Sequence, residues 1–122
     1  MPDGAGSDLT LWFNPQCSKC RGARDLLDER GISTNVVRYL EDSPTRAQLE
    51  HVLTLLGTTD PRAITRTGEP LYRDLHLAGA TREELLDALA SHPILIERPI
   101  AIRGDRAVIG RPAERVLELL DG

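Results

Sequence analysis

The segment that most constrains the fold is the first third of the chain. Residues 9–13 are apolar and β-prone and favour a buried strand. Residues 18–30 repeat apolar side chains at helical spacing, and residues 34–40 form a second β-prone run. Two strand patterns joined by one helix pattern over so short a stretch predict a βαβ unit, which favours parallel pairing of its strands.

The only two cysteines of the chain lie where the first strand pattern ends and the first helix pattern begins. Cys17 and Cys20 are separated by Ser18 and by Lys19, the sole lysine among 15 basic residues. A helix N-terminus presents unpaired N–H groups and a partial positive charge, which favour a thiolate. Lys19 and Arg21 add positive charge there. We therefore predict Cys17 as a nucleophile and place Cys20, nearly one turn later, where it can close a disulfide with Cys17.

Other uses of this cysteine pair are weaker. Two buried cysteines can serve as small hydrophobic side chains, and a Cys-x-x-Cys motif can be half of a zinc site. No second pair exists and the three histidines are scattered, so we expect no metal. A phosphatase-like loop needs an arginine six places after its cysteine, but that place after Cys17 is Ala23 and Arg24 comes one residue too late.

Two capping boxes mark helices in the middle of the chain. Thr45 and Thr81 each precede a helical apolar pattern and are followed three residues later by Gln or Glu. Between the two helices, residues 60–65 read as one helical turn capped by an aspartate. Residues 66–74 are polar and contain Gly and Pro, so we expect mostly loop there.

The last third of the chain predicts a hairpin and a helix. Residues 99–103 and 106–109 are apolar runs on either side of a Gly-Asp turn signal. Residues 112–120 follow as a helix opened by a proline. The apolar face predicted for this helix consists of Val116, Leu117 and Leu120. The whole order, β-α-β, a helical insert and β-β-α, resembles the thioredoxin-like α/β fold with a four-stranded mixed sheet.

Composition narrows the class of protein further. With 122 residues and a net charge of −4, the chain fits one domain over residues 9–122, after a flexible leader at residues 1–8 without signal-peptide features. The apolar runs are too short for a membrane span, the slight acidity disfavours nucleic-acid binding, and two cysteines disfavour a secreted disulfide scaffold. We expect a cytoplasmic, monomeric protein, and the arginine excess suggests a bacterial source.

Short motifs spread over residues 9–120 are shared with a known family. They are Asn14-Pro15-Gln16-Cys17 with Arg21, Tyr39-Leu40-Glu41, Ala63-Ile64-Thr65-Arg66 with Glu69-Pro70, His92-Pro93-Ile94-Leu95-Ile96-Glu97-Arg98-Pro99-Ile100, and Gly110-Arg111-Pro112. On these motifs the chain resembles the ArsC-type arsenate reductases, the glutaredoxin-coupled class with a thioredoxin-like fold. The long His-Pro run is the most specific of them.

The resemblance implies a substrate and a set of anion-binding residues. Cys17 matches the family's nucleophilic cysteine, which attacks arsenate and forms a thiol-arsenate adduct. The three arginines that surround the oxyanion in the family match Arg66, Arg98 and Arg111. Guanidinium groups suit this task because their forked donors neutralise a tetrahedral anion with directional hydrogen bonds.

Two more residues gain expected roles from the resemblance. Arg21 matches a basic residue just after the active-site loop and is expected to assist by its charge. Pro99 occupies the place of the cis-proline that packs against the active-site cysteine in thioredoxin-like folds. Arg98 is therefore expected to face Cys17.

The reductant is left open by one departure from the family pattern. Arsenate reductases of this class use glutathione and then glutaredoxin without a second active-site cysteine, whereas this chain has Cys20. We expect no bound cofactor and an external thiol partner, either glutathione with glutaredoxin, mycothiol with mycoredoxin, or thioredoxin. Phe13 also stands where some members carry a histidine. Two alternatives stay open: a redox-sensing regulator that binds RNA polymerase, as the Spx proteins with the same Cys-x-x-Cys motif do, and an ArsC-like thiol oxidoreductase with another substrate.

Overall fold

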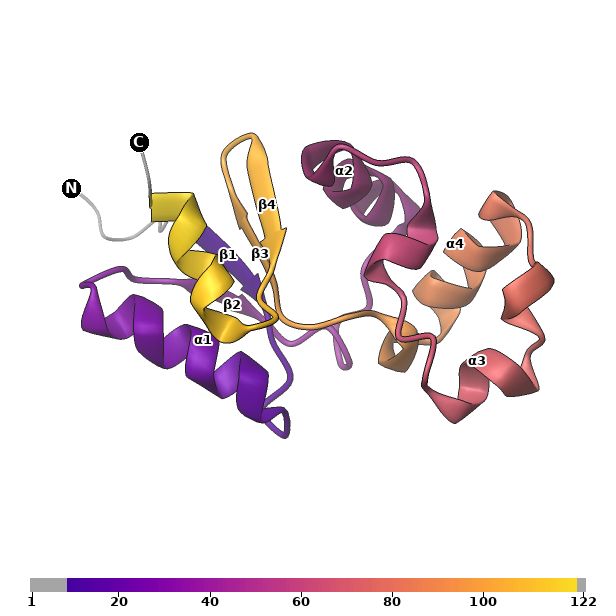
Figure 1. Ribbon diagram of the computed structural model, residues 1–122, viewed down its shortest axis with the longest axis horizontal. Helices are drawn as coiled ribbons and strands as arrows, with labels where there is room; N and C mark the ends of the chain where they lie inside the picture. Colours follow the sequence, from indigo (N-terminus) through magenta and orange to yellow (C-terminus); the bar gives the residue numbers. More distant parts are fainter. Residues whose placement is uncertain (1–8, 121–122) are drawn as a thin grey trace. The chain divides into compact units, whose positions relative to one another are not determined.

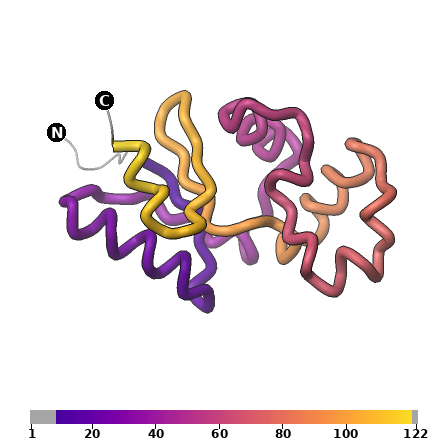
Figure 2. The backbone as a smooth tube through the Cα atoms, in the orientation of Figure 1, coloured from indigo at the N-terminus to yellow at the C-terminus, as the bar shows by residue number. Residues whose placement is uncertain are grey.

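The computed structural model describes residues 9–120, and the contacts among its residues divide the chain into two compact units. Among the described residues, the first unit consists of 9–39 and 98–120, and the second is Leu40–Glu97. Figure 2 shows this order along the backbone, from indigo through magenta and orange to yellow. The expected leader at residues 1–8 lies outside the described residues, and a single domain from residue 9 onward stays a prediction.

The first unit is built on a four-stranded mixed sheet with the strand order β2-β1-β3-β4. The strands are β1 (Leu9–Trp12), β2 (Asn35–Val37), β3 (Ile100–Arg103) and β4 (Arg106–Ile109). β1 pairs parallel with β2 and antiparallel with β3, and β3 pairs antiparallel with β4. The predicted thioredoxin-like α/β fold is therefore confirmed, including the hairpin, which turns at Gly104 with a φ of 59° (Figure 1).

Two helices complete the first unit, α1 (Ser18–Glu29) and the 3-10 helix η4 (Ala113–Leu120), and they lie against each other (Figure 1). The core beneath them combines residues from the strands and from both helices. Its buried members are Leu9, Leu11, Phe13, Cys20, Ala23, Leu27, Ala101, Val108, Val116 and Leu119. One of the two cysteines is thus a core residue, and Cys17 packs at the edge of the same cluster.

The face that η4 buries differs from the one predicted. We expected Val116, Leu117 and Leu120, but the buried residues are Val116 and Leu119, while Leu117 and Leu120 are partly buried. A 3-10 helix has three residues per turn, so residues i and i+3 lie directly above one another. The prediction used the α-helical period, which points to the neighbouring residues instead.

The second strand is also shorter than predicted. Only Asn35–Val37 pairs with β1, whereas residues 34–40 were expected to be extended. β2 is an edge strand with a single neighbour, and that neighbour ends at Trp12, opposite Val37. Pairing therefore stops where the partner strand stops.

The second unit is helical. Its longer helices are α2 (Arg46–Leu56) and α4 (Arg82–Ser91), and its short helical segments are η1 (Pro61–Ile64), α3 (Pro70–Asp74), η2 (Leu77–Gly79) and η3 (Pro93–Leu95). Arg46 of α2 forms ion pairs with Glu83 and Asp87 of α4. In the part of the chain that the structure describes, no helix has both the length and the apolar character needed to cross a bilayer.

Both predicted capping boxes are confirmed. The Thr45 hydroxyl accepts from the Gln48 N–H at 3.1 Å, and the Gln48 side chain accepts from the Thr45 N–H at 2.9 Å. Thr81 and Glu84 make the same pair of bonds at 3.1 and 2.8 Å. The predicted helical turn after Asp60 is present as η1.

One segment of the second unit corrects the sequence analysis. Residues 66–74 were expected to be mostly loop, but Pro70–Asp74 forms the short helix α3. Pro70 occupies the first helical position, where its fixed φ fits a helix and its missing N–H loses no hydrogen bond. A proline treated as a loop signal therefore acts as a helix start.

Removal of a capping box should be visible as a loss of stability. The Thr45→Ala substitution is expected to lower the free energy of unfolding by about 1 kcal/mol, because the Gln48 N–H loses its acceptor. Urea titration followed by circular dichroism measures this change. Thr59→Ala is the matched control, since Thr59 is exposed and caps no helix. An equal loss in both variants would show that the cap contributes nothing specific.

Candidate active site

The loop before α1 is a turn held by Asn14. Its side-chain oxygen accepts from the Gln16 N–H at 2.9 Å, and its carbonyl accepts from the Cys17 N–H at 2.9 Å. Asparagine favours such turns because its side chain bonds to the backbone two residues on. Cys17 thereby becomes the N-cap residue of α1, with φ −95° and ψ 120°, and its carbonyl accepts from the Arg21 N–H at 3.1 Å.

Arg21 has a structural contact that the sequence did not predict. Its Nη1 donates to the carbonyl of Pro15 at 2.8 Å, so the side chain reaches back from the first turn of α1 to the loop. The resemblance had suggested only assistance by charge. The observed contact holds the loop that carries Cys17, and assistance by charge stays a prediction.

The two cysteines occupy different environments. Cys17 is partly exposed, whereas Cys20 has no exposed surface and belongs to the core. Both are free thiols. A dissolved substrate therefore meets Cys17 first, and Cys20 reacts only with a species already attached to Cys17 or after a local rearrangement.

The pKa values of the two thiols are shifted in opposite directions, as their different exposure suggests. Burial opposes ionisation of Cys17, but the N–H and thiol of Cys20, the N–H of Lys19 and the positive charge of Arg98 together hold the pKa of Cys17 below its ordinary value. Burial chiefly raises the pKa of Cys20, to about 12, and the neighbouring Cys17 adds to this. At neutral pH Cys20 is thus a protonated hydrogen-bond donor, and Cys17 is the thiol that ionises more readily.

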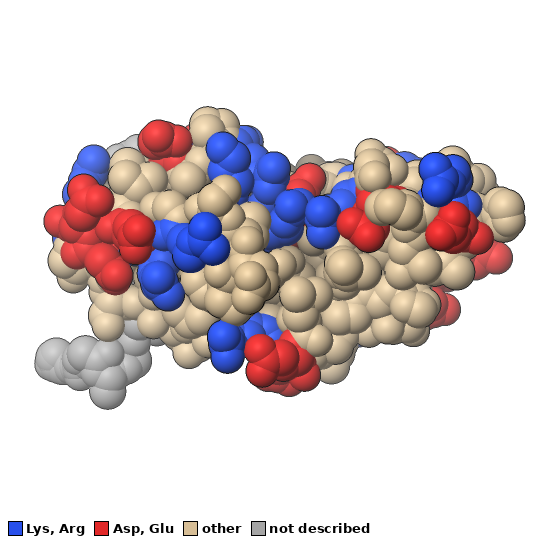
Figure 3. All heavy atoms as spheres, turned by 90° about the horizontal axis from the view of Figure 1, so that it is seen from below, with Lys and Arg blue, Asp and Glu red and all other residues tan. Residues whose placement is uncertain are grey.

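The charges along α1 reinforce this asymmetry. Lys19 and Arg21 lie in its first turns, whereas its second half carries the exposed acids Asp25, Asp28 and Glu29. In Figure 3 acidic side chains gather over this end of α1, at the left of the view. A helix is stabilised by the opposite arrangement, with acids at the N-terminus. The charge distribution on α1 therefore lowers the stability of the helix, but it places positive charge near the Cys17 sulfur.

Arg98 and Pro99 lie in the first unit, directly before β3. The Arg98–Pro99 peptide bond is cis, and so is Arg111–Pro112, which the sequence analysis did not expect. Arg98 lies close enough to Cys17 and Cys20 for its charge to lower the pKa of both thiols. Its side chain is partly buried.

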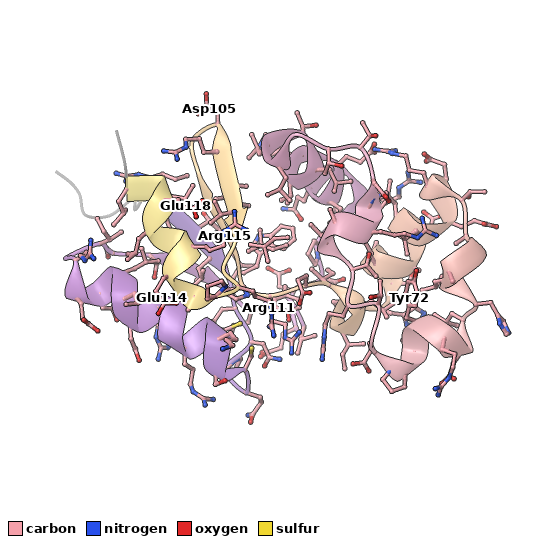
Figure 4. The ribbon with its side chains drawn as sticks, viewed as in Figure 1. Tyr72, Asp105, Arg111, Glu114, Arg115 and Glu118 are labelled. Atoms are coloured by element: carbon pink, nitrogen blue, oxygen red, sulfur yellow. The ribbon has the colours of Figure 1, made fainter. Side chains whose placement is uncertain are left out.

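Arg111 is brought to the same region. It is exposed and lies at the turn that precedes η4, where Figure 4 labels it. Its Nη1 donates to the carbonyl of Arg98 at 3.1 Å. Two of the three arginines expected at the oxyanion are therefore linked to each other by a direct hydrogen bond.

Arg66 belongs to the second unit and is held firmly there. Its N–H donates to the carbonyl of Leu95 at 2.7 Å, and Nη1 donates to the carbonyl of Ile94 at 3.3 Å. Nη2 lies 3.4 Å from Oε2 of Glu69, and only 25% of the Arg66 side chain is exposed. The motif residues around Arg66 thus fix its backbone and one edge of its guanidinium group.

A contact between Arg24 and Phe13 was not predicted from the sequence. The guanidinium carbon of Arg24 lies 4.9 Å from the centre of the Phe13 ring, within the range of a cation–π interaction. Arg24 follows Cys17 by seven residues, which is nearly two helical turns, and this spacing is the signal that places it on the same side of α1. The contact covers a ring that directly precedes the active-site loop.

Metal binding receives no support from the described geometry. Among residues 9–120, no three His, Cys, Asp or Glu side chains come together in a group that could hold a metal ion.

The fold and this region together define a class, namely thioredoxin-fold proteins with a partly exposed cysteine at the start of the first helix and a basic residue beside it. The model of the ArsC family matches residues 12–119, and the chain belongs to this family. It is 38% identical to an arsenate reductase of Neisseria meningitidis over 93% of this chain and 98% of that one. It is 41% identical to an uncharacterized protein of Escherichia coli over 92% of this chain and 96% of that one.

A solved structure extends the comparison to three dimensions. The arsenate reductase from Vibrio cholerae superposes with a TM-score of 0.88 and is 41% identical, covering 91% of this chain and 96% of the other. The agreement spans both compact units of this chain, so neither is an addition peculiar to it.

Proposed function

We propose that this protein reduces arsenate to arsenite, with Cys17 as the attacking thiolate. The observation that carries the proposal is the unequal pair of thiols: Cys17 is partly exposed and the charge of Arg98 helps to lower its pKa, while Cys20 is buried and burial raises its pKa. A thiolate next to a guanidinium group suits attack on a negatively charged tetrahedral substrate. The names of the relatives from Neisseria meningitidis and Vibrio cholerae support arsenate as that substrate.

The reaction balances as a two-electron reduction in two steps. The Cys17 thiolate forms a sulfur–arsenic bond while an arsenic–oxygen bond breaks, and the oxygen leaves as water after taking up protons. A second thiol then attacks the Cys17 sulfur and loses its proton. A disulfide forms, the sulfur–arsenic bond breaks, and its electron pair stays on arsenic, which changes from As(V) to As(III).

The arginines have two tasks in the first step. Arg98 and Arg111 bind the oxyanion and neutralise it as it approaches the thiolate. The same donors stabilise the charge that develops as the arsenic–oxygen bond breaks. That Arg66 also contacts the oxyanion stays a prediction, and loss of arsenate affinity in Arg66→Lys is its test.

An external thiol must reduce the disulfide after each turnover, so the assay has to include the thiol system that this protein uses. Arsenite formation should be measured with glutaredoxin plus glutathione, with mycoredoxin plus mycothiol and with thioredoxin, in parallel. The proposal predicts arsenate-dependent thiol consumption with at least one system. If none supports turnover and the protein instead retains the α subunit of RNA polymerase in a pull-down, the regulator alternative is favoured. The cytoplasmic location and monomeric state stay predictions.

Substitution of Cys20 distinguishes whether the second thiol is Cys20 itself or an external thiol. If Cys20 resolves the adduct, Cys20→Ser should lose most turnover with a protein dithiol as reductant, because no Cys17–Cys20 disulfide can form. Serine keeps the size and a hydrogen-bond donor in the core position. The expected loss is about 10-fold or more in kcat, measured by arsenite formation. Full turnover in Cys20→Ser would exclude the intramolecular disulfide and leave the second step to an external thiol.

A further inference from the structure

The turn between β4 and η4 contains a buried glycine that touches the segment beside the thiol. The Gly110 N–H donates to the carbonyl of Pro99 at 2.8 Å. A Cβ placed on Gly110 would lie 2.8 Å from Cγ of Pro99 and 3.0 Å from Cγ1 of Val116. Neither the proline ring nor the core valine can move away freely, so this position accepts only glycine without a shift of its neighbours.

The same turn holds the neighbouring residue as well. Arg111 follows Gly110 and donates from Nη1 to the carbonyl of Arg98 at 3.1 Å. Two consecutive residues of the turn therefore bond to the carbonyls of two consecutive residues, Arg98 and Pro99. Both hydrogen bonds require the close contact at Gly110, because a side-chain atom there would push the turn before η4 away from the Arg98–Pro99 segment.

We propose that Gly110 is a positioning residue for the chemistry at Cys17: its missing side chain lets the turn before η4 hold Arg98 beside the thiol. The link to arsenate rests on the proposed function. The positioning itself concerns only how the Cys17 sulfur and Arg98 are arranged, and it is therefore testable without arsenate.

The other charged groups near Cys17 are held independently of Gly110. Lys19 and Arg21 belong to α1, and Arg21 is tied to the loop through Pro15. Arg98 lies two residues before β3, and Arg111, two residues before η4, bonds to its carbonyl. A shift of the Pro99 segment thus changes the arginine side of the environment and leaves the helix N-terminus in place.

The test compares Gly110→Ala with Gly22→Ala. Gly22 lies on α1, and a Cβ there would be 3.7 Å from the Ala113 side chain, which is an ordinary contact. The rate of iodoacetamide alkylation of Cys17 is measured over a pH series. Trypsin cleaves after Lys19 and so places the two cysteines in different peptides for mass spectrometry.

The expected result is a shift of the Cys17 titration midpoint to higher pH in Gly110→Ala, by about 0.5 to 1 pH unit, and no shift in Gly22→Ala. Arsenate reduction should fall about 10- to 100-fold, as misplacement of a binding group by about 1 Å does. A purely structural defect would lower the melting temperature without moving the midpoint.

If Gly110→Ala does not fold, the same substitution can be tested in a protein that also carries Val116→Ala. Val116→Ala removes one of the two close contacts, so the double variant keeps only the one with Pro99. The midpoint should still shift relative to Val116→Ala alone. An unshifted midpoint in a folded variant, or an equal shift in Gly22→Ala, would overturn the inference. If the wild type does not reduce arsenate, the proposed function fails while a shifted midpoint still supports the positioning role.

Discussion

Replacement of Cys17 by serine should abolish arsenate reduction while the protein keeps its fold. We expect kcat to fall by roughly 1,000-fold or more, as removal of a nucleophile does in other enzymes. A serine hydroxyl is not ionised at neutral pH, and neither the helix N-terminus nor Arg98 stabilises an alkoxide enough to replace the thiolate. The measurement is arsenite formation under the reductant that supports the wild type.

The same substitution should not destabilise the protein. Cys17 is the N-cap of α1, and its side chain makes no capping bond. Serine is a favoured N-cap residue, so Cys17→Ser should leave stability unchanged or raise it by about 0.5 kcal/mol. Ser18→Ala is the matched control for activity, because Ser18 is the exposed neighbour and has no role in the proposal. Abundant turnover in Cys17→Ser would contradict the account.

Replacement of Arg98 by lysine should have the second-largest effect. Lysine keeps the charge but loses the fork of donors, so we expect kcat/KM to fall about 10- to 100-fold, and roughly 100- to 1,000-fold in Arg98→Ala. The charge of Arg98 also lowers the pKa of Cys17, so the alanine variant should shift the alkylation midpoint of Cys17 upward. Since the thiolate exists above its pKa, that variant should regain part of its lost activity as pH rises.

A matched substitution distinguishes this effect from a general need for arginine. Arg73 has 82% of its side chain exposed, so Arg73→Lys should leave kcat/KM unchanged. Retention of full activity in Arg98→Lys would show that charge alone suffices and that directional hydrogen bonds to the oxyanion are not needed.

Features that depend on neighbours in sequence could be predicted well. The capping boxes at Thr45 and Thr81 and the hairpin at Gly104 follow from turn and cap chemistry within a few residues, and the βαβ unit follows from the local apolar periodicity of residues 9–40. Cys17 at a helix N-terminus follows in the same way. These features need no knowledge of distant parts of the chain.

Features that depend on distant neighbours could not be predicted. Leu119 rather than Leu120 is buried because η4 adopts 3-10 geometry against α1. The bond from Arg111 to the carbonyl of Arg98 and the close approach of Gly110 to Pro99 join segments more than ten residues apart. The sequence motifs identified the arginines through a resemblance, but only the structure shows that two of them form one hydrogen-bonded unit.

The most direct test of the central claim measures two pH profiles in one buffer series: the rate of arsenite formation and the rate of Cys17 alkylation without arsenate. If the Cys17 thiolate attacks arsenate, arsenite formation should rise with pH on its acidic side with the midpoint found for alkylation, and Arg98→Ala should move both midpoints upward together. Arsenite formation that is independent of Cys17 ionisation, or that continues in Cys17→Ser, would contradict the account.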